Sequence, residues 1–210
     1  MGVIRRGILG GFSNKVGNIV GSSWKGIAVV KSLPLSVSNP RTAGQVLQRG
    51  KFKQLTVLAS LLLSAIVKPL WDRFATNMSG YNAFISANRD AFHSNGKINY
   101  EEVQMSRGRI LAPDIEGAVM SGNNFIIDVG NPDHDRFGLP SDRIYVVVTD
   151  AALSKIALAQ VTSFTRGAGA TVKMTIPIPP GVEQGNCQVS YVGYLRADGS
   201  EVSRSSNYVF

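Results

Sequence analysis

The first 71 residues of this 210-residue sequence contain no Asp or Glu, and the first acidic residue is Asp72. The same stretch holds ten Lys or Arg residues. Residues 1–110 contain 15 basic and 4 acidic residues, a net charge of +11, whereas residues 111–210 contain 7 and 10, a net charge of −3. A solvated surface normally carries both signs. This segregation therefore favours attachment to a negative partner: nucleic acid, an acidic protein surface or a membrane.

Cysteine is almost absent, since Cys187 is the only one in the sequence. A single cysteine forms no intramolecular disulfide and no thiolate metal cluster, and the count favours a reducing compartment. Histidine is nearly as rare: His93 and His134 are far apart, which excludes the paired histidines of a zinc motif. Cys187 falls on a predicted strand with no histidine near it in sequence, so a buried structural thiol is favoured over a nucleophile.

Long apolar runs are also missing. The most apolar run, Leu55–Val67, has 13 residues; it is too short to span a bilayer and is predicted to be a buried helix. The start of the chain has two Arg but no continuous apolar stretch of signal-peptide length. Its first six residues, MGVIRR, lack the Ser or Thr of a myristoylation signal. We therefore expect a soluble, cytoplasmic chain that does not contact a membrane.

No catalytic constellation stands out. The run Asp133-His134-Asp135 brings two carboxylates together and would suit a cation. It lacks the Gly and Glu spacing of an EF-hand, and a solvated turn is the favoured interpretation. Gly17 and Gly21 precede Lys25, but their spacing differs from that of a phosphate-binding loop and no helix is predicted to follow. We expect no enzyme activity, no metal and no cofactor.

The apolar content is sufficient for a real core. Hydrophobic residues make up 44% of the chain, which argues against general disorder. Seven Gly fall within residues 1–26, a composition of turns and extended backbone. We predict an α+β fold in three parts: a basic Gly-rich β arm or hairpin over residues 1–38, a short helical segment over residues 39–98, and an immunoglobulin-like β-sandwich domain over residues 99–210.

The helical segment begins with a clear signal. Pro40 keeps Asn39 out of the helical region, and Thr42 can cap a helix with Gln45 three residues later. Apolar residues at helical spacing carry this first helix to about Val67, and Pro69 breaks it. The pattern then predicts a second helix from Leu70 to about Met78 and a third from Ser79 to about Phe92.

From about residue 100 the apolar period changes to two. Turn signals separate the predicted strands, which are Val103–Met105, Glu116–Met120, Asn124–Val129, Arg143–Thr149, Lys155–Phe164, Thr171–Ile176, Cys187–Leu195 and a last one near Ser203–Phe210. About seven short strands in such a length are typical of an immunoglobulin-like or fibronectin-like sandwich. The Cys-Trp-Cys hallmark of antibody domains is absent, so the prediction concerns architecture only.

Three interpretations of the basic segment remain open: a solvated surface, a nucleic-acid arm in which aromatic side chains stack on bases, and an arm that docks on protein. Docking on protein is favoured, because the basic residues are spread out rather than clustered and the glycines permit close approach. The candidate residues for binding a partner or nucleic acid are Arg5, Arg6, Lys15, Trp24, Lys25, Lys31, Arg41, Arg49, Lys51 and Lys53.

Several sequence motifs resemble one known family. The run from Gly11 to Gly26, GFSNKVGNIVGSSWKG, and the Asn39-Pro40-Arg41-Thr42 start of the helix are the most specific. Tyr81–Phe84 and Ser106–Gly108 also match. Together they resemble an uncharacterised domain family of Bacteroidetes genomes and their phages that has no assigned activity. The chain departs from the pattern after Thr42, where Ala-Gly stands in place of Pro-Ala. The resemblance implies no catalytic residues.

These observations predict a non-enzymatic structural protein. The leading hypothesis is a phage virion component that forms a multi-subunit ring, collar or shell in the host cytoplasm, with further copies of itself and other virion proteins as partners. The alternative is a nucleic-acid-binding protein that uses the basic N-terminal region. A surface adhesion module is the third hypothesis, and it is disfavoured because no export signal is visible.

Overall fold

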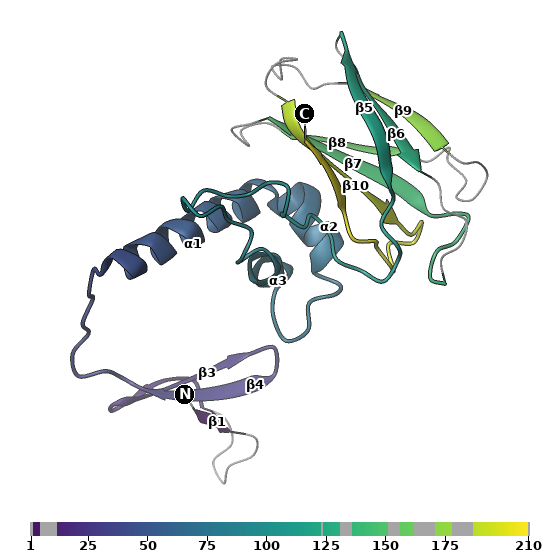
Figure 1. The fold of residues 1–210 in the computed structure, drawn as a ribbon. Coiled ribbons are helices and arrows are strands. Elements are labelled where there is room, and N and C mark those ends of the chain that lie inside the picture. Colours follow the sequence, from purple (N-terminus) through teal and green to yellow (C-terminus); the bar gives the residue numbers. More distant parts are fainter. Residues whose placement is uncertain are drawn as a thin grey trace. The chain divides into compact units, whose positions relative to one another are not determined.

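Helices and antiparallel sheets both occur along the chain, which confirms the α+β prediction (Figure 1). The computed structural model describes residues 2–4, 12–122, 124–130, 136–150, 156–161, 171–177 and 187–209. The chain divides into two compact units, Met1–Val46 and Leu47–Phe210. Because their placement relative to each other is not determined, each unit is described by itself.

The first unit is a four-stranded antiparallel sheet. Its strands have the order β1-β4-β3-β2, and their bounds are β1 Gly2–Ile4, β2 Asn14–Val16, β3 Ile19–Trp24 and β4 Ile27–Ser32. Two-residue loops join β2 to β3 and β3 to β4. Lys25 and Gly26 both have positive φ, 46° and 80°, as the type I′ turn of a tight hairpin requires. The predicted β arm is therefore confirmed in the described residues.

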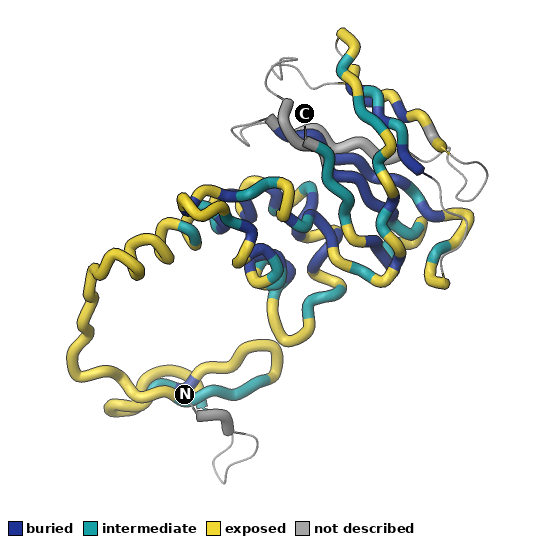
Figure 2. The backbone as a smooth tube through the Cα atoms, in the orientation of Figure 1, coloured by how far each residue is buried: buried dark blue, intermediate teal, exposed yellow. Residues whose placement is uncertain are grey.

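This sheet buries very little of itself (Figure 2). Among the described residues 12–46, Gly21 alone is buried. A Cβ atom at Gly21 would lie 2.2 Å from the carbonyl oxygen of Phe12, so only glycine allows Phe12 to cover this point of the sheet. Small sheets need a packed face for stability, and residues 12–46, for which burial is described, provide almost none.

Helix α1 (Ala43–Leu61) starts at the predicted residue. The backbone N–H of Gln45 donates to Thr42 Oγ1 at 3.4 Å, which confirms Thr42 as the cap. A π-helical turn, Leu63–Val67, follows it, and then the single turn of α2 (Lys68–Trp71). Pro69 lies in the first turn of α2 and does not break the chain's helical course, contrary to the prediction.

The predicted second helix over Leu70–Met78 is wrong. The chain leaves the helix after Trp71, and Asp72 Oδ1 accepts a hydrogen bond from the backbone N–H of Gly80 at 2.8 Å. Asn77 has a φ of +58°, which no right-handed helix contains. Helix α3 (Gly80–Ala87) begins within one residue of the predicted start, with Ser79 as its cap: Ser79 Oγ accepts a hydrogen bond from the N–H of Asn82. The helix ends earlier than predicted.

The β region contains two antiparallel sheets (Figure 1). The three-stranded sheet has the order β5-β6-β9, and its strands are β5 Ile115–Ser121, β6 Asn124–Gly130 and β9 Thr171–Pro177. The four-stranded sheet has the order β11-β10-β7-β8, and its strands are β7 Arg143–Asp150, β8 Ile156–Val161, β10 Cys187–Leu195 and β11 Ser206–Val209. Seven of the eight predicted strands are thus confirmed, with bounds shifted by a few residues.

Both faces of β7 are buried. Ile144, Val146 and Val148 join residues of β6 and β9 in the core between the two sheets. Tyr145 and Val147 point the other way and pack in a second core with α1, the π-helical turn, α2 and α3. The second unit therefore has helices, a four-stranded sheet and a three-stranded sheet stacked in that order. This arrangement explains why β7 is an unbroken apolar run rather than an alternating one.

The predicted strand Val103–Met105 is wrong. Its backbone bonds to side chains instead of to a neighbouring strand: Asn88 at the end of α3 bonds both the N–H and the C=O of Gln104, at 2.7 and 3.1 Å. Met105 bonds Trp71 and Ser205 in the same way. Through these hydrogen bonds the segment connects α3 with the β region. The helical and β segments, predicted as separate domains, accordingly share one core and lie in one unit.

Candidate functional site

Three of the predicted binding residues lie on one face of the first unit. The strand register pairs Val20 of β3 with Lys15 of β2 on one side and with Lys31 of β4 on the other. Trp24 lies four residues after Val20 on the same strand, and therefore on the same face. Neighbouring strands are about 5 Å apart, which places the two lysine backbones roughly 10 Å from each other. The result is a basic face with an aromatic ring, here called the arm face.

The arm face is open to solvent. Lys15 and Lys31 are exposed, and Trp24 is 57% exposed. No partner for either lysine lies in the described part of the chain. Lys25 is exposed in the hairpin turn, and Arg41 is exposed just before α1. Exposed cations with an exposed indole suit a negatively charged surface or strand.

The predicted basic residues of α1 belong to the second unit and do not act as one group. Lys51 Nζ lies 5.2 Å from the centre of the Phe92 ring, a cation–π contact. Arg49 and Lys53 instead line a shallow cavity of about 460 Å³ with Phe52. Phe52 is 55% exposed, so α1 also presents apolar surface between positive charges.

Several predicted features lie outside the described residues: Arg5, Arg6 and the Asp133-His134-Asp135 run. The backbone of Cys187 lies at the start of β10 as predicted, while its side chain is not described. Within the described part of the chain, no group of three or more His, Cys, Asp or Glu could hold a metal ion. In the same residues no single helix is long and apolar enough to cross a membrane; α1 and Leu63–Trp71, bent by 70°, meet the length and composition requirement only as a pair.

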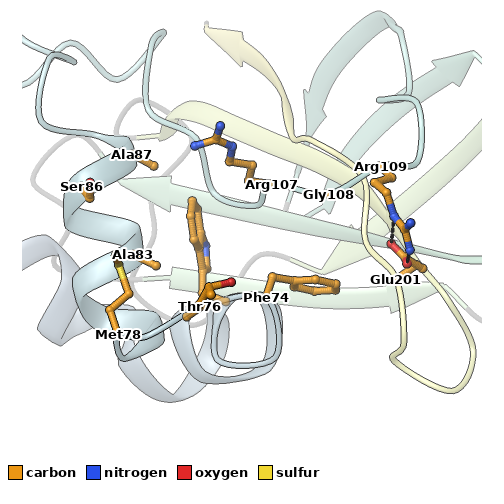
Figure 3. A pocket seen from close by; sticks show the side chains of 12 residues that line it. Phe74, Thr76, Met78, Ala83, Ser86, Ala87, Arg107, Gly108, Arg109 and Glu201 are labelled. Carbon is orange, nitrogen blue, oxygen red and sulfur yellow. Dashed lines mark hydrogen bonds and ion pairs between the residues drawn. The ribbon is translucent and has the colours of Figure 1, made fainter. Parts of the chain in front are cut away.

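A second site was not predicted from the sequence. It is a cavity of about 580 Å³ in the second unit, beside α2 and α3 (Figure 3). Its lining residues are Trp71, Phe74, Ala75, Thr76, Met78, Ala83, Ser86, Ala87, Arg107, Gly108, Arg109 and Glu201. The sequence predicted one helix for Trp71, Phe74 and Met78. In the structure Trp71 ends α2, whereas Phe74 and Met78 lie on the turns that follow it. All three side chains nevertheless line the same cavity.

Charges stand at two places on the rim of this cavity. Arg109 and Glu201 form an ion pair at one end (Figure 3). The hydrogen bond to Glu201 raises the pKa of Arg109 above its usual value. The guanidinium of Arg109 also lies 5.3 Å from the centre of the Phe137 ring. Arg107 is exposed and has no partner in the described residues. The cavity therefore carries one uncompensated positive charge.

The sequence holds only a weak signal for this site. Two arginines flank Gly108, and Ser106–Gly108 match the family pattern, but nothing local connects them with Trp71 or Glu201. A Cβ atom at Gly108 would lie 1.7 Å from the carbonyl oxygen of Val202. Glycine is needed here because residues 106–110 run directly against the segment that carries Glu201.

The arm face and the cavity are both suited to binding. The comparisons with known proteins assign neither of them a role. No curated protein and no solved structure matches the chain. One family model matches residues 11–209, which is nearly the whole chain, and agrees with the resemblance to an uncharacterised family. The chain belongs to this family, a family of unknown function designated DUF6266.

Proposed function

We propose that the protein is a non-enzymatic assembly component whose first unit docks on a neighbouring subunit. The association with phages that the sequence resemblance implies favours a virion part, such as a ring, collar or shell, as the assembled object. Docking through an arm has three requirements: the arm has regular secondary structure, it exposes apolar side chains, and it is attached to a unit that folds independently. The first unit supports the first two requirements, and the shared core of the second unit supports the third.

The observation that carries the proposal is the exposed apolar surface of the first unit. Only Gly21 is buried among residues 12–46, while large apolar side chains stand in solvent at Val16, Ile19, Trp24, Leu33, Leu35, Val37 and Val46. Leu35 is 99% exposed and Val37 80%. Exposed apolar side chains in this number are typical of a surface that a partner covers, and a sheet without a packed face gains stability from such a cover.

Charge favours a second copy of the chain as the covering surface. Residues 1–46 contain six basic residues, Arg5, Arg6, Lys15, Lys25, Lys31 and Arg41, and no acid. Residues 111–210 carry a net charge of −3. The basic N-terminal region of one copy can therefore contact the acidic C-terminal region of the next copy in a head-to-tail arrangement. Repetition of that contact builds rings or filaments.

We further infer that the β region is an immunoglobulin-like or fibronectin-like sandwich. Its first, second and fifth strands form one sheet, its third, fourth, sixth and seventh strands form the other, and the two sheets share a core. Crossing between sheets in this way is the Greek-key connection common to such sandwiches. A sandwich of this kind would serve as the rigid body of each subunit, and the arm would connect it to the neighbouring subunit.

Concentration-dependent sedimentation of the full chain tests the assembly proposal, with a matched pair of variants. Val16→Ser removes a valine that is 64% exposed on β2, and Val57→Ser removes one that is 61% exposed on α1, outside both oppositely charged regions. Burial of one valine stabilises a contact by about 1.5 kcal/mol, so V16S weakens association about tenfold while V57S leaves it unchanged. A chain that stays monomeric at every concentration, or an equal loss in both variants, contradicts the proposal.

Nucleic-acid binding is the second candidate, and the arm face is the observation that favours it. Lys15 and Lys31 offer charge for phosphates, and Trp24 offers a stacking surface. Binding through several such cations weakens steeply between about 50 and 200 mM salt. A fluorescent single-stranded oligonucleotide titrated over that range tests this candidate: binding at 50 mM salt that is lost at 200 mM salt supports it, and no binding at either salt concentration contradicts it.

A further inference from the structure

We propose that the cavity beside α2 and α3 binds a small monoanionic amphiphile, namely a carboxylate carried on an aromatic or branched apolar group. The cavity lies wholly in the second unit, so the inference is independent of the proposed assembly through the arm. Its volume of about 580 Å³ falls in the range of small-molecule sites. Four features of the lining carry the proposal.

The floor of the cavity is apolar and held rigidly. Trp71 is 4% exposed, and its ring meets Phe84 edge to face with 5.6 Å between ring centres. The indole N–H donates to the carbonyl oxygen of Met105 at 2.8 Å, so the polar atom of the side chain is satisfied and the ring is fixed. Phe74 and Met78 add flexible apolar surface on the turns after α2. A planar apolar group can therefore enter without reorganising the floor.

The space in the cavity comes from small residues. Ala83 and Ala87 lie one helical turn apart on α3 and line the same end of the cavity as Met78 (Figure 3). Larger side chains at either position would fill this end. The cavity is thus a consequence of two alanines on the cavity side of α3.

The charge at the rim selects the ligand. Arg109 is already paired with Glu201, whereas Arg107 has no partner in the described residues. One free guanidinium matches one negative charge, and its fork of N–H donors matches the two oxygens of a carboxylate. A phosphate monoester carries nearly two charges and would leave one of them unmatched.

The position of Arg107 is fixed by its neighbours. Ser106 is fully buried, and its hydroxyl donates to the carbonyl oxygen of Ser203 at 2.7 Å. Gly108 runs against Val202 on the other side. Because the residues on both sides of Arg107 are fixed, its backbone is already ordered before a ligand binds. Binding of an anion therefore costs little backbone entropy.

The experiment uses the full chain with Trp24→Phe, which leaves Trp71 as the only tryptophan, because the sequence contains two. The probes are 4-phenylbutyrate and its neutral match, 4-phenylbutanamide, and the readout is Trp71 fluorescence. We expect saturable binding of the carboxylate and binding of the amide that is about tenfold weaker, since a charge-assisted hydrogen bond is lost.

Three further variants sharpen the test. Arg107→Gln weakens carboxylate binding about tenfold and leaves amide binding unchanged, whereas Arg204→Gln, at an exposed arginine away from the cavity, alters neither. Ala87→Leu fills the cavity and abolishes binding of both probes, and its thermal midpoint shows whether it folds. If neither probe binds the folded W24F chain, or if Arg107→Gln and Arg204→Gln behave alike, the proposal is overturned.

Discussion

At the scale of single residues, Gly193 makes room for Tyr145. The two residues are directly opposite each other on β10 and β7. A Cβ atom on residue 193 would lie only 2.3 Å from the hydroxyl oxygen of Tyr145, which is too close for two non-bonded atoms. Ser106 donates its one proton to Ser203, so Tyr145 must donate its own to Ser106. The absence of one methyl group thus allows a fully buried tyrosine to complete a buried hydrogen-bond chain.

Replacement of this glycine is predicted to destabilise the second unit. Gly193→Ala drives a methyl group into the Tyr145 ring, and overpacking of this kind costs about 1–3 kcal/mol of the free energy of unfolding. Gly117→Ala on β5 is the matched control, because nothing lies within 4 Å of its added Cβ atom. Urea denaturation of both variants measures the difference. Equal stability of the two variants would show that Tyr145 moves aside without cost.

At the scale of elements, the contact between the helices and the four-stranded sheet depends on two buried phenols. Tyr145 on β7 and Tyr191 on β10 both belong to the core shared with the helices. Burial raises the pKa of each phenol above its usual value. The hydroxyl of Tyr191 donates to the carbonyl oxygen of Tyr100 at 3.0 Å, which links β10 to the chain after α3.

Alkaline pH is predicted to weaken this contact. Above about pH 10 the tyrosines of the unfolded chain lose their protons, while the folded chain keeps both. The folded state then binds more protons, so the free energy of unfolding falls as pH rises, by about 1.4 kcal/mol per pH unit for each buried tyrosine. Tyr191→Phe removes one of the two groups and should reduce the slope between about pH 10 and 12. Thermal melts across that range check the slope, and an unchanged slope in the variant would contradict the prediction.

At the scale of the whole molecule, the two units differ in how much apolar surface they bury. The two cores of the second unit include no residue before Leu55. The first unit has one buried residue in its described part beyond residue 11. The molecule therefore combines a body with its own hydrophobic core and an arm whose described apolar side chains are mostly exposed.

Removal of residues 1–41 is predicted to leave the second unit folded. The truncation keeps Thr42, the cap of α1, and deletes no member of either core. Because the deleted residues contribute little burial, the free energy of unfolding should change by no more than about 0.5 kcal/mol, while self-association is lost. Circular dichroism melts and sedimentation of the truncated chain provide the two measurements. Unfolding of the truncated chain would show that the arm stabilises its own body.

The parts of the fold that could be predicted from the sequence are those with local causes. The predicted cap at Thr42 and the predicted helix start near Ser79 are both found, because each depends on a hydrogen bond between residues only three positions apart. Turns at Gly122 and Gly199, both with positive φ, mark strand ends because few other residues adopt that backbone. The charge segregation and the arm hairpin likewise need no distant contact.

Only the tertiary structure decided the rest. Residues 103–105 have the alternating pattern of a strand, but the N–H groups of Gln104 and Met105 donate to the side chains of Asn88 and Ser205, which come from other parts of the chain. The cavity has the same origin: it joins Trp71, Arg107 and Glu201, and it leaves Arg107 free only because Glu201 pairs with another arginine. The sequence by itself determined caps, turns, strand periods and charge, since these depend on near neighbours. Burial, pairing and the shape of a binding site depend on which distant segments meet, and packing alone decides that.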